Sequence, residues 1–278
     1  MTVRTRLAAI IPCFLTLPLI CLVASAQEIN TALMNSTFEI IGNGPQIGQI
    51  VSGTGFIMGI PEKENPDVGH TVLITAAHVL NGLSGNDAKI LLRRPDGQGG
   101  YTQYPYPLPI RANGKNLYVA NPNADVAAMY ILLPQELGIT DLPIQFLADD
   151  ARLAQLQVHP GDELFCLGFP LGIDFNGFPI LRTGTLASYP ITPAKAVKRY
   201  LFTFHIFPGN SGGPVYFYFS NRVYGGSTHT GTESGVIGLV SEQINSTSPE
   251  YKNNGLDVAV VVPSTYIRET ISQLPAIP

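Results

Sequence analysis

Apolar residues along the chain recur in short runs, most of them four to eight residues long. The runs are rich in β-branched and aromatic side chains, and turn-forming sequences such as Pro95-Asp96-Gly97 and Gly225-Gly226 lie between them. This spacing predicts the antiparallel strands of a sandwich or barrel rather than alternating strands and helices. The predicted strands are residues 55–58, 71–75, 89–92, 117–120, 126–133, 163–168, 200–204, 214–219, 236–240 and 258–262.

Only two stretches have the pattern of a helix. One is short and begins near residue 77. In the other, Ile267, Ile271 and Leu274 recur at i, i+4 and i+7 and form one apolar face, with Ser264 as the predicted N-cap. Residues 134–160 are richer in Asp, Gln and Pro, and we expect the linker between two halves of the chain there.

The N-terminus has the three parts of a secretory signal peptide. Arg4 and Arg6 precede an uncharged stretch at residues 7–23, and Ala24-Ser25-Ala26 is a small-x-small cleavage site. The alternative is a permanent membrane anchor, because the apolar stretch approaches the roughly 20 residues that a span needs. A lipoprotein is not expected, since the residue before Cys21 is Ile20, which is not small.

Composition narrows the class of protein. The chain has 278 residues with a net charge of −4, and charged residues make up only 13%. Few charges argue against a coiled coil, and 45% hydrophobic residues argue against a disordered chain. Because the chain is mildly acidic and has no basic run, we expect no nucleic-acid partner.

After cleavage the chain keeps a single cysteine, Cys166, so it cannot form an internal disulfide. Cys166 lies in an apolar run and is predicted to be a small core residue rather than a nucleophile. A secreted protein of this size without disulfides is more typical of bacterial export.

Three motifs carry candidate chemistry: Thr75-Ala76-Ala77-His78-Val79, Asp125-Val126-Ala127-Ala128-Met129 and Pro208-Gly209-Asn210-Ser211-Gly212-Gly213-Pro214. His78 and Asp125 could each be structural, as a core histidine or a strand-end acid. The glycines around Ser211 allow a sharp turn that exposes the hydroxyl and the neighbouring N–H groups, and this third motif is highly specific.

Together the motifs resemble the chymotrypsin-like (trypsin-like) serine peptidases, in their disulfide-free bacterial branch of the heat-shock-protease type. His78, Asp125 and Ser211 follow one another at separations of 47 and 86 residues, much as in that family. The likeness covers roughly residues 38–275 and includes no PDZ domain. It implies an all-β fold of two six-stranded antiparallel β-barrels with a short C-terminal helix. The expected division is a signal peptide (1–26), an N-terminal extension (27–37), an N-terminal barrel (38–140), a linker (141–160), a C-terminal barrel (161–262) and a helix with a tail (263–278).

The resemblance also implies roles for the site residues. His78 would be the general base, Asp125 would orient it, and Ser211 would be the nucleophile, with the N–H groups of Gly209 and Ser211 forming the oxyanion hole.

Three further residues are expected to bind substrate: His205 at the base of the specificity pocket, Ser241 along the substrate backbone, where it also supports Asp125, and Gln243 at the pocket wall. His205 could equally be a filler in an altered loop.

Residues 217–235 are expected to form a long hairpin loop over the site. Asn210 replaces the Asp that pairs with a new N-terminal amine in many digestive relatives, so we expect a site that assembles without propeptide cleavage.

Two other kinds of site fit the sequence poorly. The Gly-x-Ser-x-Gly elbow of α/β-hydrolases needs the order Ser, acid, His, but residues 212–228 contain no Asp or Glu. The five histidines show no paired metal-ligand spacing, so no metal or cofactor is expected.

The sequence therefore predicts a secreted or periplasmic serine endopeptidase with a polypeptide substrate and no membrane span after signal cleavage. A protein-binding or chaperone-like module with little turnover, on the same scaffold, is the main alternative, and an esterase is a third. Specificity and oligomeric state stay open.

Overall fold

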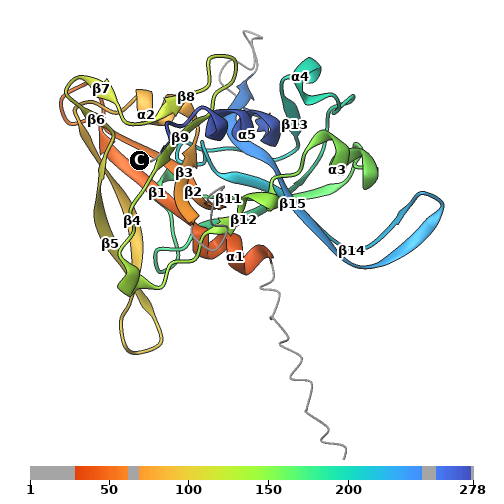
Figure 1. Cartoon of the computed structure of the whole chain (residues 1–278), viewed down its shortest axis with the longest axis horizontal. Coiled ribbons are helices and arrows are strands. Elements are labelled where there is room, and N and C mark those ends of the chain that lie inside the picture. The colour runs from red at the N-terminus through yellow and green to blue at the C-terminus, as the bar shows by residue number, and fades with distance from the viewer. Residues whose placement is uncertain (1–28, 62–68, 246–254, 277–278) are drawn as a thin grey trace, which may run out of the picture.

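The computed structural model describes residues 29–61, 69–245 and 255–276, so the predicted signal peptide lies outside the described residues. The described chain forms two β-sheets that lie side by side (Figure 1). The first sheet has the strand order β5-β4-β1-β2-β3-β9-β8, with β10 paired to β2. Its strands are β1 (Thr37–Asn43), β2 (Ile50–Pro61), β3 (Gly69–Thr75), β4 (Asp87–Pro95), β5 (Tyr101–Pro109), β8 (Val119–Ala120), β9 (Ala127–Tyr130) and β10 (Leu142–Pro143).

The second sheet has the order β12-β11-β14-β15-β16-β13, and a separate two-stranded ribbon joins β6 to β7. The bounds are β6 (Arg111–Ala112), β7 (Lys115–Asn116), β11 (Glu163–Gly168), β12 (Ile180–Thr185), β13 (Tyr200–Phe202), β14 (Pro214–Tyr224), β15 (Ser227–Asn245) and β16 (Gly255–Pro263). The sequence-based fold class is confirmed: the protein is mainly β, with two barrel-like sheets and a short C-terminal helix. The first sheet has eight strands rather than six because it includes the two-residue strands β8 and β10, and among the described residues neither strand order closes into a complete barrel.

Edge and central strands differ in sequence as their positions require. β5, at one end of the first sheet, carries Pro105, Pro107 and Pro109, which cannot donate to a second neighbouring strand. β3 lies between β2 and β9, and its residues Val72 to Ile74 are almost completely buried. Buried central strands place the residues at their ends rigidly, which matters for the site below.

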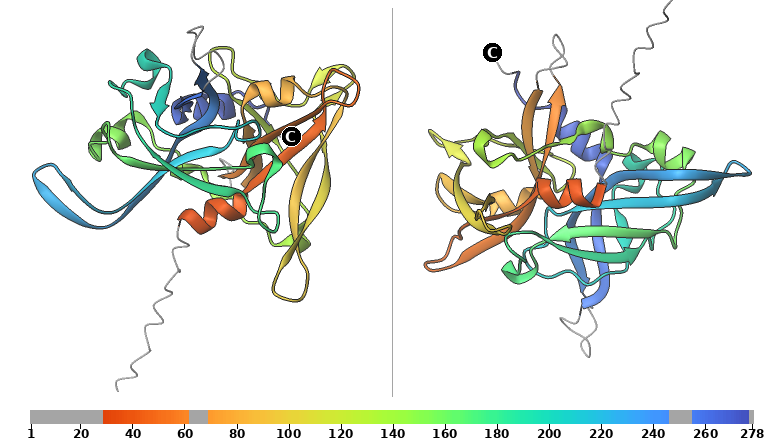
Figure 2. Two further views of the ribbon diagram at one scale, coloured as in Figure 1. Left: turned by 180° about the vertical axis from the view of Figure 1, so that it is seen from behind. Right: turned by 90° about the horizontal axis from the view of Figure 1, so that it is seen from below.

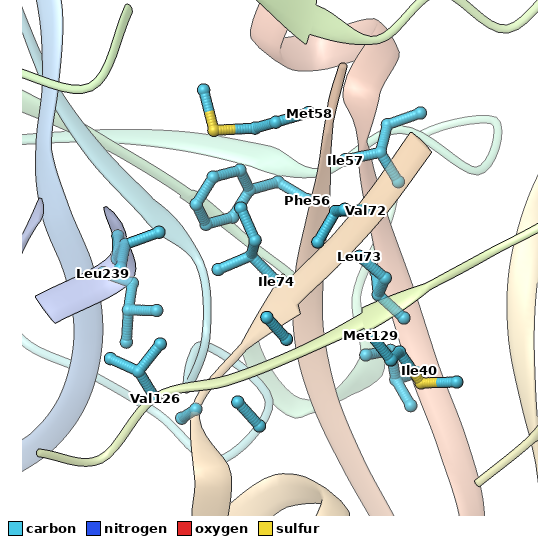
Figure 3. Close-up of a cluster of buried hydrophobic side chains, with 14 of the residues drawn as sticks. Ile40, Phe56, Ile57, Met58, Val72, Leu73, Ile74, Val126, Met129 and Leu239 are labelled. Carbon is cyan, nitrogen blue, oxygen red and sulfur yellow. The ribbon is translucent and has the colours of Figure 1, made fainter. Parts of the chain in front are cut away.

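The main hydrophobic core is continuous between the sheets. It contains Phe56 and Leu73 of the first sheet and Leu239 of the second sheet (Figure 3). Leu167 and Tyr216 of the second sheet belong to the same cluster. A second cluster lies within the second sheet and contains Cys166, which is fully buried in β11. The prediction of a core cysteine is confirmed, and burial raises the pKa of its thiol to about 12.

The C-terminal helix α5 (Ser264–Ser272) forms where the sequence predicts it and buries Ile267 and Ile271. The prediction that Ser264 is the N-cap is wrong. Pro263 occupies that position, and the Ser264 hydroxyl instead donates to the backbone carbonyl of Ala148. This bond ties the start of the helix to the segment that joins the two sheets.

The helix near residue 77 is α2 (Ala77–Asn81). The structure contains further helices that the apolar pattern did not indicate. They are α1 (Ile29–Ser36), α3 (Asp150–Gln155), α4 (Ala194–Val197) and the 3₁₀ turns η1 (Gln135–Leu137), η2 (Ile144–Phe146) and η3 (Pro170–Gly172). The first lies in the expected N-terminal extension and α3 in the expected linker. Asp149 caps α3 by accepting a hydrogen bond from the Arg152 N–H at 2.8 Å, as a helix start requires.

Residues 217–235 do not cover the site as expected. They form the outer part of the β14–β15 hairpin, which has a register shift between Phe219 and Asn221 and turns at Gly225-Gly226. The hairpin extends away from the body of the molecule in all three views (Figures 1 and 2). None of its residues lines the pocket that contains His78 and Ser211. The strand pairing explains why the prediction failed. Residues that pair as two antiparallel strands form an extended ribbon, and this ribbon does not lie over the site.

Candidate active site

His78 and Asp125 are brought together by neighbouring strands of the first sheet. β3 ends just before His78, and β9 begins just after Asp125. The two strands pair with Thr75 opposite Ala127, so the residues beyond these ends meet at one edge. Asp125 accepts two hydrogen bonds from His78: Oδ2 lies 2.6 Å from ring Nδ1, and Oδ1 lies 2.9 Å from the backbone N. This double contact fixes the position and the plane of the imidazole.

The ionisation of the pair follows from these contacts. Burial alone would raise the pKa of Asp125, but hydrogen bonds from His78 and Ser241 and the charge of His78 hold it below its usual 3.8. An ionised carboxylate only accepts hydrogen bonds, so ring Nδ1 carries the proton and Nε2 is the free base. The hydrogen bond to Asp125 raises the pKa of His78 above 6.5. Burial lowers this pKa, while the negative charges of Asp125 and Glu242 raise it further.

Ser241, on β15 of the second sheet, links this pair to Ser211. Its hydroxyl donates to Asp125 Oδ2 at 2.6 Å, and its carbonyl accepts from the Ser211 hydroxyl at 3.1 Å. Within the described residues, no hydrogen bond joins the Ser211 hydroxyl to the His78 ring. The hydroxyl must therefore leave the Ser241 carbonyl before it can give its proton to His78.

The turn around Ser211 leaves two N–H groups without a partner. The N–H groups of Asn210, Gly212 and Gly213 donate to backbone carbonyls, at 3.1, 2.7 and 3.0 Å. Among the described residues, no hydrogen bond is made by the N–H groups of Gly209 and Ser211. These are the two donors that the sequence analysis assigns to the oxyanion hole, and two adjacent free donors can stabilise a negative oxygen.

Two glycines of this turn have a steric reason to be there. Gly209 has φ of +98°, and a Cβ at this position would lie 2.1 Å from the Phe169 carbonyl oxygen. Gly212 has φ of +89°, and a Cβ there would lie 2.1 Å from the Thr54 carbonyl oxygen. No other residue fits either position, because both the backbone angle and the space exclude a side chain.

An open pocket of about 840 Å³ lies against the side chains of this site. His78, Asp125, Ser211 and Ser241 line it, together with His205, Gln243 and Glu242 from the segments that the sequence assigned to the specificity pocket. Every predicted catalytic and substrate-binding side chain therefore borders a single cavity. In the described ranges, no group of three or more His, Cys, Asp or Glu side chains could hold a metal ion.

His205 and Gln243, which line the pocket, make contacts that the sequence did not indicate. The Nδ1 atom of His205 lies 2.5 Å from Asp257 Oδ1, and Gln243 Oε1 accepts from the Ile206 N–H at 2.9 Å. Asp257 comes from β16, 52 residues away from His205 along the chain. No local sequence signal could have identified it.

The chain is similar to known proteins in part of its sequence and in its fold. The profile of the trypsin-like peptidase domain matches residues 53–225. The structure is similar to the active form of the Rv3671c protease from M. tuberculosis, with 17% identity, a TM-score of 0.49 and coverage of 90% of this chain and 85% of that one. It is also similar to the protease Anisep from Arthrobacter nicotinovorans, with 17% identity, a TM-score of 0.49 and coverage of 87% of this chain and 96% of that one. No curated protein matches the chain.

Proposed function

The chain belongs to the family of trypsin-like peptidase domains, and we propose that it is a serine endopeptidase that acts through His78, Asp125 and Ser211. The observation that carries the proposal is that a carboxylate-held imidazole and a serine hydroxyl line one pocket, and that the turn carrying this serine has two N–H groups without a partner among the described residues. Each of these groups supplies a different part of peptide-bond hydrolysis.

In the proposed reaction, Ser211 Oγ attacks the carbonyl carbon of the peptide bond while His78 Nε2 takes the hydroxyl proton. The carbonyl oxygen becomes negative and accepts hydrogen bonds from the Gly209 and Ser211 N–H groups, where one such donor typically contributes about 3–4 kcal/mol. The tetrahedral intermediate collapses as His78 gives its proton to the leaving amine. Water, with His78 again as the base, then hydrolyses the ester on Ser211.

We also propose that the protein acts outside the cytoplasm, in the periplasm or the medium. The support is the signal-peptide pattern of residues 1–26. No helix in the described ranges has both the length and the apolar character needed to cross a membrane.

The function is tested by incubating the chain that begins at Gln27 with an unstructured protein substrate and identifying the products by mass spectrometry. Cleavage at internal peptide bonds is expected. Release of terminal residues only would contradict an endopeptidase, and hydrolysis of esters without cleavage of peptides would favour an esterase.

Activity should fall as the pH decreases, with a midpoint above the ordinary pKa of histidine. His78 accepts a proton only when it is neutral, and the hydrogen bond that its ring donates to Asp125 raises its pKa above 6.5. The neutral fraction therefore declines as the pH drops through a value higher than 6.5. The measurement is kcat/KM between about pH 5 and 9. A profile that stays flat to pH 5 would contradict His78 as the base.

Gln243 is proposed to limit the depth of the specificity pocket. Its carboxamide oxygen accepts a hydrogen bond from the Ile206 N–H and so connects two of the segments that line the pocket. We expect Gln243→Gly to improve the kcat/KM ratio of a substrate with Phe before the cleaved bond over one with Ala by about tenfold, the lower end of the roughly 10- to 200-fold that one methylene is worth in a hydrophobic pocket.

The matched control for that variant is Asn245→Gly. Asn245 also lines the pocket, but among the described residues its side chain makes no hydrogen bond to the Ile206 segment. The Phe-to-Ala ratio should stay at the wild-type value in this control. An unchanged ratio in Gln243→Gly would show that other residues set the depth.

A further inference from the structure

Thr54 of the first sheet makes three hydrogen bonds into the second half of the molecule, close to the two free N–H groups. Its hydroxyl donates to the Gly209 carbonyl at 2.6 Å and accepts from the Phe169 N–H at 3.2 Å. Its backbone N–H donates to the Ser211 carbonyl at 2.8 Å. Thr54 is fully buried and lies in the middle of β2, between β1 and β3. It is therefore a rigid point from which the Ser211 turn can be held.

The turn has little other support from its own side chains. Asn210 is 1% exposed, and neither polar atom of its carboxamide has a hydrogen-bond partner in the described part of the chain. The carboxamide contributes packing but no directional contact. The direction of the peptide groups around Gly209 must therefore be fixed by other residues.

The carbonyls of the two peptide groups that flank Gly209 each accept a hydrogen bond, and the Asn210 N–H also donates to the Phe207 carbonyl at 3.1 Å. The Pro208 carbonyl accepts from the Leu171 N–H at 2.7 Å. Because N–H and C=O point in opposite directions in a trans peptide, this bond aims the Gly209 N–H away from Leu171. The following peptide, which joins Gly209 to Asn210, is set by the Thr54 hydroxyl on the Gly209 carbonyl, and only Asn210 separates it from the Ser211 N–H. Gly209 has the wide conformational freedom of glycine, so the tether restricts the most flexible link of the turn.

We propose that the Thr54 hydroxyl is a positioning residue for the oxyanion hole, which keeps the Gly209 and Ser211 N–H groups directed at one point before substrate arrives. The inference rests on the proposed function. Without the hydroxyl, the Gly209 carbonyl loses its partner in a buried place and the 209–210 peptide turns to find another. The two donors then diverge. Catalysis thus depends on a contact between the two sheets, across 155 residues of sequence.

The test compares Thr54→Val, which removes only the hydroxyl at nearly constant shape, with Thr54→Ser, which keeps it. We expect Thr54→Val to lower kcat by about 10- to 100-fold with KM close to wild type, because the lost interaction acts on the transition state. A peptide trifluoromethyl ketone, whose adduct with Ser211 carries an oxyanion, should bind weaker by a similar factor. A peptide with a reduced, non-hydrolysable bond should bind equally well. Thr54→Ser should remain close to wild type in all three measurements.

Thr270→Val is the matched control for loss of a buried threonine hydroxyl. Thr270 is also fully buried, donates to the Tyr266 carbonyl at 2.7 Å and accepts from Asn121 Nδ2 at 3.1 Å, but it lies on α5 and does not line the pocket. Its kcat should not change.

The proposal is overturned if Thr54→Val keeps the wild-type kcat, if Thr54→Ser loses as much as Thr54→Val, or if inhibitor and ground-state peptide weaken equally. If Thr54→Val does not fold, Thr54→Ala takes its place, and an equal kcat in Thr54→Ala and Thr54→Ser overturns the proposal. A wild-type protein without peptidase activity would instead refute the proposed function itself.

Discussion

Replacing Ser211 by alanine is expected to lower kcat for peptide hydrolysis by about 10⁶-fold, the loss typical of removing a serine nucleophile. The substitution deletes a hydroxyl whose one hydrogen bond in the described structure goes to the Ser241 carbonyl. The turn is held by backbone contacts that the substitution does not touch. We therefore expect an unchanged melting temperature and no labelling by a fluorophosphonate probe.

The control for the Ser211 experiment is Ser84→Ala. Ser84 has a hydroxyl bonded to the carbonyls of Asn43 and Gly44 and does not line the pocket. This variant should be labelled like the wild type. Equal labelling of the Ser211 variant would contradict the assigned nucleophile. Assisted folding of a client protein that persists in Ser211→Ala, with no cleavage by the wild type, would favour the protein-binding alternative.

The site motifs could be predicted because each is local. Gly209 and Gly212 are required by backbone angles within one turn, and the strand before His78 is recognisable from its own apolar residues. The motifs predict one site for His78, Asp125 and Ser211, the family resemblance adds Ser241 and Gln243, and all five residues line a single pocket.

Contacts between distant segments could not be predicted in the same way. The bond from Thr54 to Gly209 spans 155 residues, and the pairing of His205 with Asp257 spans 52. Helix α1 was missed for a related reason. Its Asn, Thr and Ser residues have low helix propensity, and the helix is stabilised by burying Ile29 and Leu33 in the core.

Converting Asp125 to asparagine should lower kcat by about 10⁴-fold while leaving the fold intact. The amide oxygen can still accept from the His78 backbone N–H, as Asp125 Oδ1 does now at 2.9 Å. The other side-chain atom that faces the imidazole is then the amide nitrogen, which donates a hydrogen bond to Nδ1, whereas the carboxylate oxygen accepted one from it. The ring then carries its proton on Nε2 and cannot take one from Ser211. The residual activity should also persist to lower pH, because the hydrogen bond that raises the pKa of His78 is lost.

The matched control is Asp257→Asn, which changes the other histidine–carboxylate contact of the pocket. Asp257 bonds His205 at 2.5 Å and makes no contact with His78 among the described residues. If the effect of Asp125 comes from the tautomer of His78, Asp257→Asn changes KM for some substrates but leaves kcat near the wild-type value. Similar losses of kcat in the two variants would mean that both carboxylates act only through the charge of the pocket. A wild-type kcat in Asp125→Asn would remove this carboxylate from the mechanism, because no other group holds the ring by its Nδ1 atom in the described structure.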